Sequence, residues 1–156
     1  MVKIEGAFSF AAPPERVWSR LLDPDALRSC IPGCTELTQT GPDTWTAGLS
    51  VGAGPVRGAY AGTVRLSDER PPETYRLEVE GRGRPGFVKG TALVKLTPEG
   101  EGTRVTVDAE GQVRGTVAAV GQRMLVGVAR MLMTQFFECL RAGVAPAPEG
   151  GAPRSR

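Results

Sequence analysis

The feature that most restricts the fold of this chain is a single change in the spacing of its apolar residues, near residue 115. After this point the apolar residues follow a helical period over 116–142, roughly 26 residues or about 40 Å of helix. Before it, apolar and polar residues alternate over short segments, as they do in strands with one buried face. These segments are 2–10, 35–40, 44–51, 55–67, 74–84, 87–97 and 103–113.

Prolines and glycines mark the connections between these segments. Pro13-Pro14 and Asp23-Pro24 predict the first turns of two short helices, the second over 25–29, and Pro85-Gly86 predicts a tight turn. Connections this short predict antiparallel strands. An antiparallel sheet with one apolar face needs a cover, and the C-terminal helix is the one element long enough to supply it. We therefore expect an α+β helix-grip fold, with a curved sheet of about seven strands and a hydrophobic cavity under the long helix.

The chain has 156 residues, a length that predicts one domain. We place this domain at 1–142 and expect a disordered tail at 143–156, where Ala, Pro and Gly dominate. We expect no signal peptide, because no apolar h-region follows Met1, and no apolar run approaches the roughly 18 residues that span a bilayer. The chain has three cysteines, whereas secreted proteins held together by disulfides usually have an even number. We expect a cytoplasmic protein with reduced cysteines.

The chain contains no histidine, which excludes Ser–His and Cys–His catalysis and every histidine-containing metal site. A net charge of +2 and an aromatic content of 6% give no basis for nucleic-acid binding. The spacing of Cys30 and Cys34 indicates a metal or redox site only weakly. A structural zinc site needs four ligands, and Cys139 is the one remaining cysteine. We expect no metal and interpret 30–34 as a structural or cavity-mouth loop.

The segment 52–58 is rich in glycine and superficially similar to a phosphate-binding loop. Its third glycine is misplaced for that motif, and Pro55 removes an amide that a phosphate would need. We therefore predict a glycine-rich hairpin or bulge.

The strand alternation places charged residues on the outer face of the predicted sheet. They are Arg57, Arg65, Arg76, Glu78, Glu80, Arg82, Lys89, Lys95, Arg104, Asp108 and Glu110. General acid–base catalysis needs a positioned titratable group, and no strand supplies one on the inner face. We therefore expect no catalytic residue.

Glycine is frequent on the same inner face, at Gly58, Gly62, Gly81, Gly83, Gly90 and Gly111. A glycine inside a strand packs nothing and costs conformational entropy. Either these glycines leave volume for an apolar cavity, which we favour, or they serve sheet curvature and bulges.

One stripe of the long helix is expected to face this cavity, and it includes Met124 and Met131. Methionine adapts to varied apolar ligands, although core packing explains either one equally well. Gln135 is the polar member of the stripe, and it either binds the polar end of a ligand or lies near the sheet edge. The residues expected to line the cavity are Phe8, Ile31, Tyr60, Gly62, Val79, Gly81, Val88, Gly90, Ala92, Val107, Gly111, Val113, Val117, Gly121, Met124, Val128, Met131 and Gln135.

A second apolar stripe occupies the far side of this helix. It comprises Val126, Ala129, Met133, Phe137 and Leu140, with Arg123, Arg130 and Arg141 beside it. An exposed apolar strip usually marks an interface, and a partner protein, a homodimer or an anionic membrane surface would each fit. The alternative is that the tail or the N-terminal helices cover it.

Several motifs occur in a specific order along 1–142. They are Pro14-Glu15-Arg16-Val17-Trp18, Asp23-Pro24, Cys30-Ile31-Pro32-Gly33-Cys34, Gly52-Ala53-Gly54-Pro55-Val56-Arg57-Gly58, Gly86-Phe87-Val88-Lys89-Gly90, Gly121-Gln122-Arg123-Met124 and Gln135-Phe136-Phe137. Together they resemble the carbon monoxide dehydrogenase G-subunit family, part of the START-like, polyketide-cyclase-like helix-grip (SRPBCC) superfamily. The resemblance implies a hydrophobic pocket and an accessory role for a molybdenum-containing carbon monoxide dehydrogenase or related hydroxylase. That role is recruitment of the enzyme to the membrane or transfer of quinone to it, and the resemblance implies no catalytic residue.

Three functions are compatible with these observations. The first, which we adopt, is a non-catalytic module that requires no cofactor and binds a quinone- or lipid-like ligand, in the cytoplasm or at the inner face of the membrane. The second is a cyclase- or hydrolase-type enzyme of the same superfamily, which needs an acid or base on the inner face. The third is a pure assembly or docking factor that uses the second stripe.

Overall fold

The structure is a computed structural model that describes residues 2–52 and 57–143. The elements follow the predicted order, with β1 (Val2–Phe10), α1 (Pro14–Leu21) and α2 (Pro24–Cys30) ahead of six more strands. These strands are β2 (Cys34–Gly41), β3 (Thr44–Val51), β4 (Gly58–Arg70), β5 (Thr74–Gly83), β6 (Gly86–Glu99) and β7 (Gly102–Arg114). The predicted tail beyond Gly143 and the centre of the glycine-rich segment, 53–56, lie outside the described residues.

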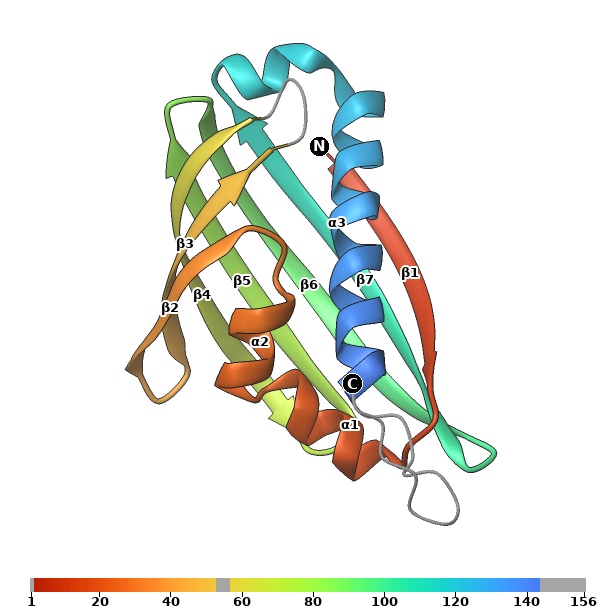
Figure 1. Cartoon of the computed structure of the whole chain (residues 1–156). Helices are drawn as coiled ribbons and strands as arrows, with labels where there is room; N and C mark the ends of the chain where they lie inside the picture. Colours follow the sequence, from red (N-terminus) through yellow and green to blue (C-terminus); the bar gives the residue numbers. More distant parts are fainter. Residues whose placement is uncertain (1, 53–56, 144–156) are drawn as a thin grey trace.

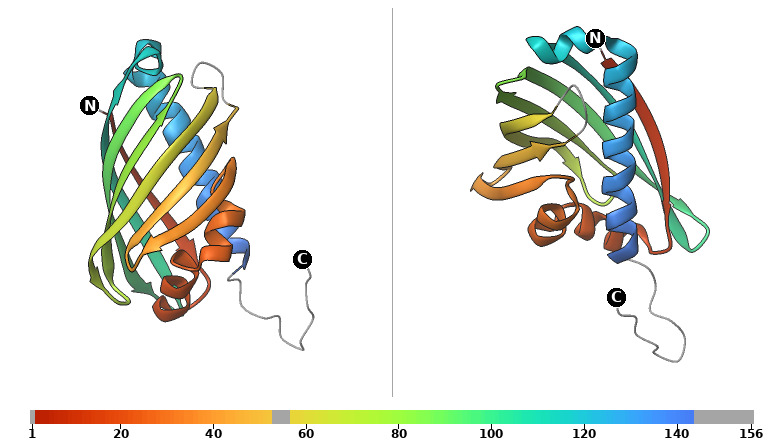
Figure 2. Two further views of the ribbon diagram at one scale, coloured as in Figure 1. Left: turned by 90° about the vertical axis from the view of Figure 1, so that its left-hand side faces the viewer. Right: turned by 45° about the horizontal axis from the view of Figure 1, so that its top comes forward.

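The seven strands form one antiparallel sheet in the order β1-β7-β6-β5-β4-β3-β2. Strands β1 and β2 are therefore the two edges, and α1 and α2 carry the chain from one edge to the other. The sheet is curved, and the C-terminal helix lies on its concave side, over β7 and β1 (Figure 1). Figure 2 shows the same arrangement from two further directions. The predicted helix-grip fold is confirmed.

The C-terminal helical segment is interrupted, although the sequence predicts one helix over 116–142. Residues Thr116–Val120 form a 3-10 helix, η2, and the α-helix α3 runs over Gln122–Gly143. Gly121 separates them with a φ of +96°, a conformation that costs little for glycine and much for residues with a Cβ. Apolar spacing continues across this one-residue break, so the periodicity does not reveal it.

Burial decreases along the sheet from one end to the other. At the end that α1 and α2 close, Phe10, Val94 and Val105 from the strands pack with Val17 of α1 and Leu140 of α3. At the opposite end the inner side chains are half-exposed, and Val79 reaches 37% exposure. The concave face is therefore open in the half where the inward glycines occur.

Helix α3 contacts the sheet through the stripe that was expected to face a partner or a membrane. Phe137 and Leu140 are buried, and the Met133 side chain lies over Gly6 of β1, where an added Cβ would be 2.7 Å from the Met133 Cε. The expectation of an exposed strip is therefore wrong for Met133, Phe137 and Leu140, although Val126 is half-buried and Arg123 and Arg130 are exposed. Periodicity finds two apolar stripes, but contacts with β1 decide which one faces the sheet.

Candidate ligand-binding site

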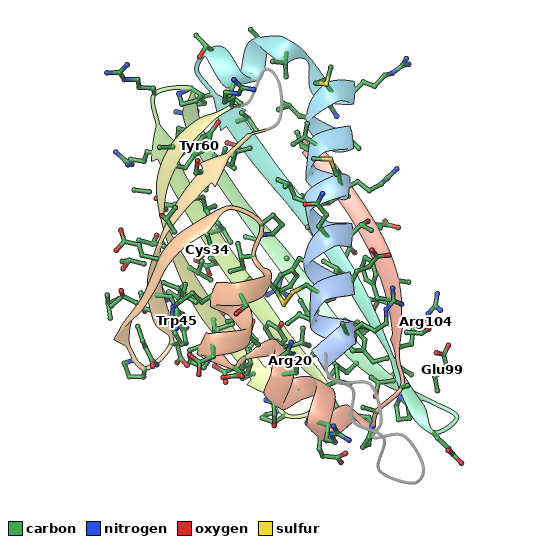
Figure 3. All side chains as sticks on the ribbon, in the orientation of Figure 1. Arg20, Cys34, Trp45, Tyr60, Glu99 and Arg104 are labelled. Atoms are coloured by element: carbon green, nitrogen blue, oxygen red, sulfur yellow. A yellow bond between two sulfur atoms is a disulfide. The ribbon has the colours of Figure 1, made fainter. Side chains whose placement is uncertain are left out.

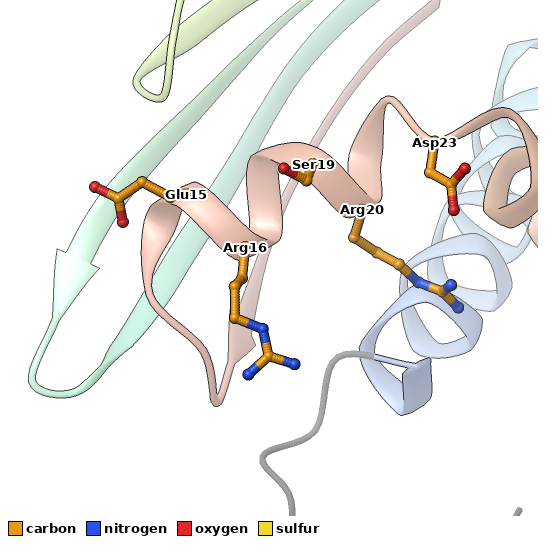
Figure 4. Close-up of a pocket in the computed structure, with 5 residues that line it drawn as sticks. All are labelled: Glu15, Arg16, Ser19, Arg20 and Asp23. Atoms are coloured by element: carbon orange, nitrogen blue, oxygen red, sulfur yellow. The ribbon is translucent and has the colours of Figure 1, made fainter.

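A first hollow, of about 580 Å³, lies along α1 and is lined by polar side chains alone: Glu15, Arg16, Ser19, Arg20 and Asp23 (Figure 4). The Arg20 side chain turns toward the end of α3, where its Nε donates a hydrogen bond to the Leu140 carbonyl over 3.4 Å. We interpret this hollow as a solvated, charged surface, because it lies away from the concave face of the sheet. Through Arg20 it also helps to hold the end of α3.

A second hollow, of about 410 Å³, lies between α3, the α2–β2 connection and the end of β3. Its lining residues are Pro32, Gly33, Ser50, Val51, Gly52, Met131, Leu132 and Gln135. The volume is within the range of about 300–1,000 Å³ that is typical of small-molecule pockets. The lining is apolar apart from Ser50 and Gln135 and contains no charged side chain. Such a site suits a small apolar ligand with an uncharged polar group.

The α2–β2 connection is placed in this wall by a close contact with β3. The Ser50 amide donates a hydrogen bond to the Gly33 carbonyl over 2.8 Å, and Gly33 has a φ of +77°. A Cβ at Gly33 would collide with the Ser50 carbonyl, so only glycine allows the loop to lie this close. The positions of Pro32 and Gly33 in the lining therefore follow from local backbone packing.

Some of the inward glycines face open volume, and others allow close approach of strands in a curved sheet. An added Cβ at Gly81 would meet no atom within 4 Å, which agrees with open volume in front of the sheet. At Gly62, its partner on β4, the added Cβ would be 2.7 Å from the Glu80 carbonyl oxygen. At Gly90 and Gly111 the corresponding distances to neighbouring carbonyls are 3.0 Å. These three glycines thus permit close approach of strands, as curvature requires.

The charged strand residues lie on the outer face, as predicted. Glu78 is paired with Arg65 across β4 and β5, and Glu110 is paired with Lys3 across β1 and β7. Asp108 and Glu110 are exposed and alternate with the inward Val107 and Ala109. Among the described strand residues, no carboxylate, ammonium or guanidinium group lies at an inward position of the alternation.

Two tyrosines occupy inner positions of the sheet. Burial raises the pKa of the Tyr60 phenol on β4, which Figure 3 labels. Burial also raises the pKa of Tyr75, whose ring packs edge-on against Trp18 with centroids 5.2 Å apart. Both phenols are therefore neutral at physiological pH and offer polar groups without charge.

The structure places the predicted lining residues in three groups. Met131 and Gln135 line the hollow of about 410 Å³. Phe8, Ala92, Val107 and Val117 are buried or pack against the core. The remaining predicted residues are not among those that line either hollow, and they lie on the inner face of the sheet, on α3 or in the connections: Ile31, Tyr60, Gly62, Val79, Gly81, Val88, Gly90, Gly111, Val113, Gly121, Met124 and Val128. Contact of any of them with a ligand stays a prediction.

Sequence reasoning did not find most of the wall opposite α3. Pro32, Gly33 and Gly52 lie in connections, where alternation does not fix the direction of a side chain, and Ser50 and Val51 are the last two residues of β3. The interpretation of 30–34 as a loop near a cavity mouth was the one available signal.

The expectation of reduced cysteines is wrong for two of the three. Cys30 and Cys139 form a disulfide with Cα atoms 5.4 Å apart, and Cys34 is free. The short spacing in the sequence drew attention to Cys30 and Cys34. Cys30 instead bonds to Cys139, because the end of α2 lies against α3. Within the described residues, no group of three or more His, Cys, Asp or Glu side chains could hold a metal ion. In the same part of the chain, each helix is too short or too polar to cross a membrane.

Comparison with solved structures supports the fold. A conserved protein from Geobacillus kaustophilus is 39% identical over 92% of this chain and 95% of that chain, with a TM-score of 0.89. A START superfamily protein from Mycobacterium smegmatis is 14% identical over 91% of this chain and 96% of that one, with a TM-score of 0.72. The di-domain ARO/CYC protein StfQ of the steffimycin biosynthetic pathway is 14% identical over 92% of this chain and 50% of that one, with a TM-score of 0.69.

The two more distant similarities show the fold alone. Comparison with curated proteins gave no significant match. The family model for CoxG, the G-subunit of carbon monoxide dehydrogenase, matches residues 6–145, nearly the whole chain. The chain therefore belongs to the carbon monoxide dehydrogenase G-subunit (CoxG) family.

Proposed function

We propose that this protein is a non-catalytic accessory protein that binds a small apolar ligand, quinone- or lipid-like, in the hollow between α3, the α2–β2 connection and β3. The observation that carries the proposal is the apolar, uncharged lining of this hollow, beside a concave sheet face without strand-borne charges in the described residues. Burial of apolar area supplies affinity there without a charged partner.

The magnitude of this effect is sufficient for useful binding. Apolar burial contributes about 25 cal/mol per Å², so a ligand that buries about 400 Å² gains about 10 kcal/mol. Immobilisation of the ligand costs about 4 kcal/mol or more. The remainder of about 6 kcal/mol corresponds to a dissociation constant of some tens of micromolar.

The side-chain amide of Gln135 gives the ligand a direction. Gln135 lies one helical turn after Met131 on α3. Ser50 pairs with Ala59 and alternates with the inward Leu49 and Val51, so its hydroxyl lies on the outer face of β3. The Gln135 amide can donate a hydrogen bond to a carbonyl oxygen. We infer that the polar end of the ligand lies at Gln135, with its apolar part against Met131, Leu132 and Val51.

We further propose that the protein acts as an accessory protein of a molybdenum-containing carbon monoxide dehydrogenase or a related hydroxylase. Its membership of the CoxG family supports this role. In this role the redox chemistry belongs to the partner enzyme, and the protein itself needs no cofactor. Contact with that enzyme, with a second copy or with the inner face of a membrane would use the exposed part of α3, where Arg123 and Arg130 flank exposed Met124.

A cyclase-type enzyme of the same superfamily is the alternative function, and the fold of StfQ is compatible with it. Such an enzyme needs a group on the inner face that transfers protons near neutral pH. Burial raises the pKa of Tyr60 further from neutrality, which disfavours this role. Ligand binding without turnover is therefore the better supported function.

The test uses menaquinone-4 as the probe, followed by native mass spectrometry and by displacement of the neutral fluorophore N-phenyl-1-naphthylamine. Met131→Glu places a charge in the hollow, and Gln122→Glu is a matched control that adds the same charge at an exposed position of the same helix. Met131 is 42% exposed, so its replacement does not disturb the core. We expect saturable binding to the wild type and to Gln122→Glu, and at least about tenfold weaker binding to Met131→Glu. Absence of saturable binding to the wild type, or equal loss in both variants, would refute the proposal.

A further inference from the structure

The disulfide joins the two walls of the proposed ligand site at one end. Cys30 is the last residue of α2, and Cys139 lies near the end of α3, 109 residues later. Pro32 and Gly33 of the lining follow Cys30 almost directly. Gln135 and Leu132 precede Cys139 by four and seven residues, a spacing that places all three on one side of α3. The bond therefore connects the backbone of one wall to the helix of the other.

The two walls differ in how firmly the rest of the molecule holds them. The α2–β2 connection is attached to β3 through the Ser50–Gly33 hydrogen bond. In α3, Phe137 and Leu140 are the buried residues, and both belong to the last two turns. The part of α3 that lines the hollow is half-exposed or exposed. Contacts of Met133, Phe137 and Leu140 hold α3 to the β1 side of the sheet, whereas the disulfide is the covalent link between α3 and the α2–β2 side of the hollow.

We propose that the Cys30–Cys139 disulfide is a redox clamp on the ligand site: oxidation holds the two walls together, and reduction lets α3 move away from the α2–β2 connection so that ligand exchanges faster. This inference rests on the proposed function, because it concerns the same hollow. The reductant is a dithiol.

The exchange begins at Cys139, because Cys139 is half-buried and Cys30 is only 4% exposed. A thiolate of the dithiol attacks the Cys139 Sγ, and the Cys30 sulfur leaves as a thiolate that takes up a proton. The second thiolate of the dithiol then displaces the Cys139 sulfur, which is also protonated. Two electrons and two protons pass to the protein, and the dithiol becomes a cyclic disulfide.

The experiment measures release of N-phenyl-1-naphthylamine from the full chain by stopped-flow fluorescence, with and without dithiothreitol. Maleimide labelling and mass spectrometry count one thiol in the oxidised protein and three after reduction. Cys139→Ser removes the clamp at the more accessible position, and Cys34→Ser is the matched control that keeps it. Circular dichroism confirms that each form is folded.

We expect release to be about tenfold faster from the reduced wild type than from the oxidised wild type. Cys139→Ser should release the probe at the fast rate in both conditions, and Cys34→Ser should respond to dithiothreitol as the wild type does. Equal release rates from oxidised and reduced wild type, or three free thiols in the protein before reduction, would overturn the clamp while leaving the proposed function intact. Failure of both forms to bind the probe would overturn both.

Discussion

The ring of Phe8 on β1 stacks on the ring of Phe137 on α3, with centroids 4.4 Å apart and planes inclined by 14°. Phe10 meets the same ring edge-on at 6.4 Å, and Phe136 does so at 5.0 Å. This cluster fixes α3 to the β1 edge of the sheet. The opposite side of the concave face, toward β2 and β3, consequently remains available for the hollow.

The first prediction concerns this aromatic cluster. Phe137→Ala should lower the free energy of unfolding by about 3–5 kcal/mol, because it leaves a cavity in the core. Urea unfolding followed by circular dichroism measures the loss, and Met124→Ala on the exposed side of α3 is the control. A double-mutant cycle with Phe8→Ala should give a coupling of about 0.5–1.5 kcal/mol. A loss below about 1 kcal/mol for Phe137→Ala would contradict the assignment of this side of α3 to the core.

The second prediction compares two glycines that are paired across β4 and β5. Gly62→Ala should destabilise the protein by about 1–3 kcal/mol, because the new Cβ would press on the Glu80 carbonyl. Gly81→Ala should be neutral or stabilising by up to about 1 kcal/mol, since the new methyl enters open space and the unfolded chain loses freedom. Urea unfolding of both variants tests the pair, and equal losses would show that the two glycines do not differ in this way.

The third prediction concerns a pair of carboxyl groups at the closed end of the sheet. The pKa of Glu69 is raised above its ordinary value of 4.5. The largest cause is partial burial of the carboxyl group, and a hydrogen bond to Asp43 and the charge of Asp43 add to it. The folded protein therefore binds the Glu69 proton more tightly than the unfolded chain does. The resulting stability is present below pH 4.5 and is lost as the pH rises through the raised pKa.

Glu69→Gln removes this dependence on pH. The variant should match the wild type at pH 4 and be more stable by a few tenths of a kcal/mol at pH 7, a small effect because the side chain is exposed. Urea midpoints at the two pH values provide the measurement, with Glu101→Gln in the turn between β6 and β7 as the control. A variant that is less stable than the wild type at pH 7 would reverse the sign of the argument.

The sequence determined the faces of the strands well, because alternation depends on local geometry alone. Tyr60 and Gly62 point inward and Arg65 and Glu78 outward, as the pattern indicated. The same reasoning could not decide which stripe of α3 faces the sheet, since that choice depends on contact with β1, a strand more than 100 residues away in sequence. Gly121 ends the 3-10 segment through its backbone conformation, which leaves no trace in the apolar spacing.

The candidate site was less accessible to sequence reasoning than the fold. Met131 and Gln135 could be found because both lie on one helical stripe. Gly33 and Ser50 could not, because they meet through a hydrogen bond between a loop and a strand end. The Cys30–Cys139 bond depends on how α2 packs against α3, a long-range contact that no local spacing encodes.

The fourth prediction concerns Thr103, a fully buried polar residue at the start of β7. Its hydroxyl donates a hydrogen bond of 2.7 Å to the carbonyl of Ala12, in the connection between β1 and α1. Thr103→Val keeps the shape but leaves this buried carbonyl without its donor, which should cost about 1–3 kcal/mol. Thr103→Ser keeps the donor and loses one methyl group, at about 0.8 kcal/mol. Urea unfolding should therefore place the valine variant below the serine variant in stability. The reverse order would mean that methyl packing, rather than the hydrogen bond, holds the connection to β7.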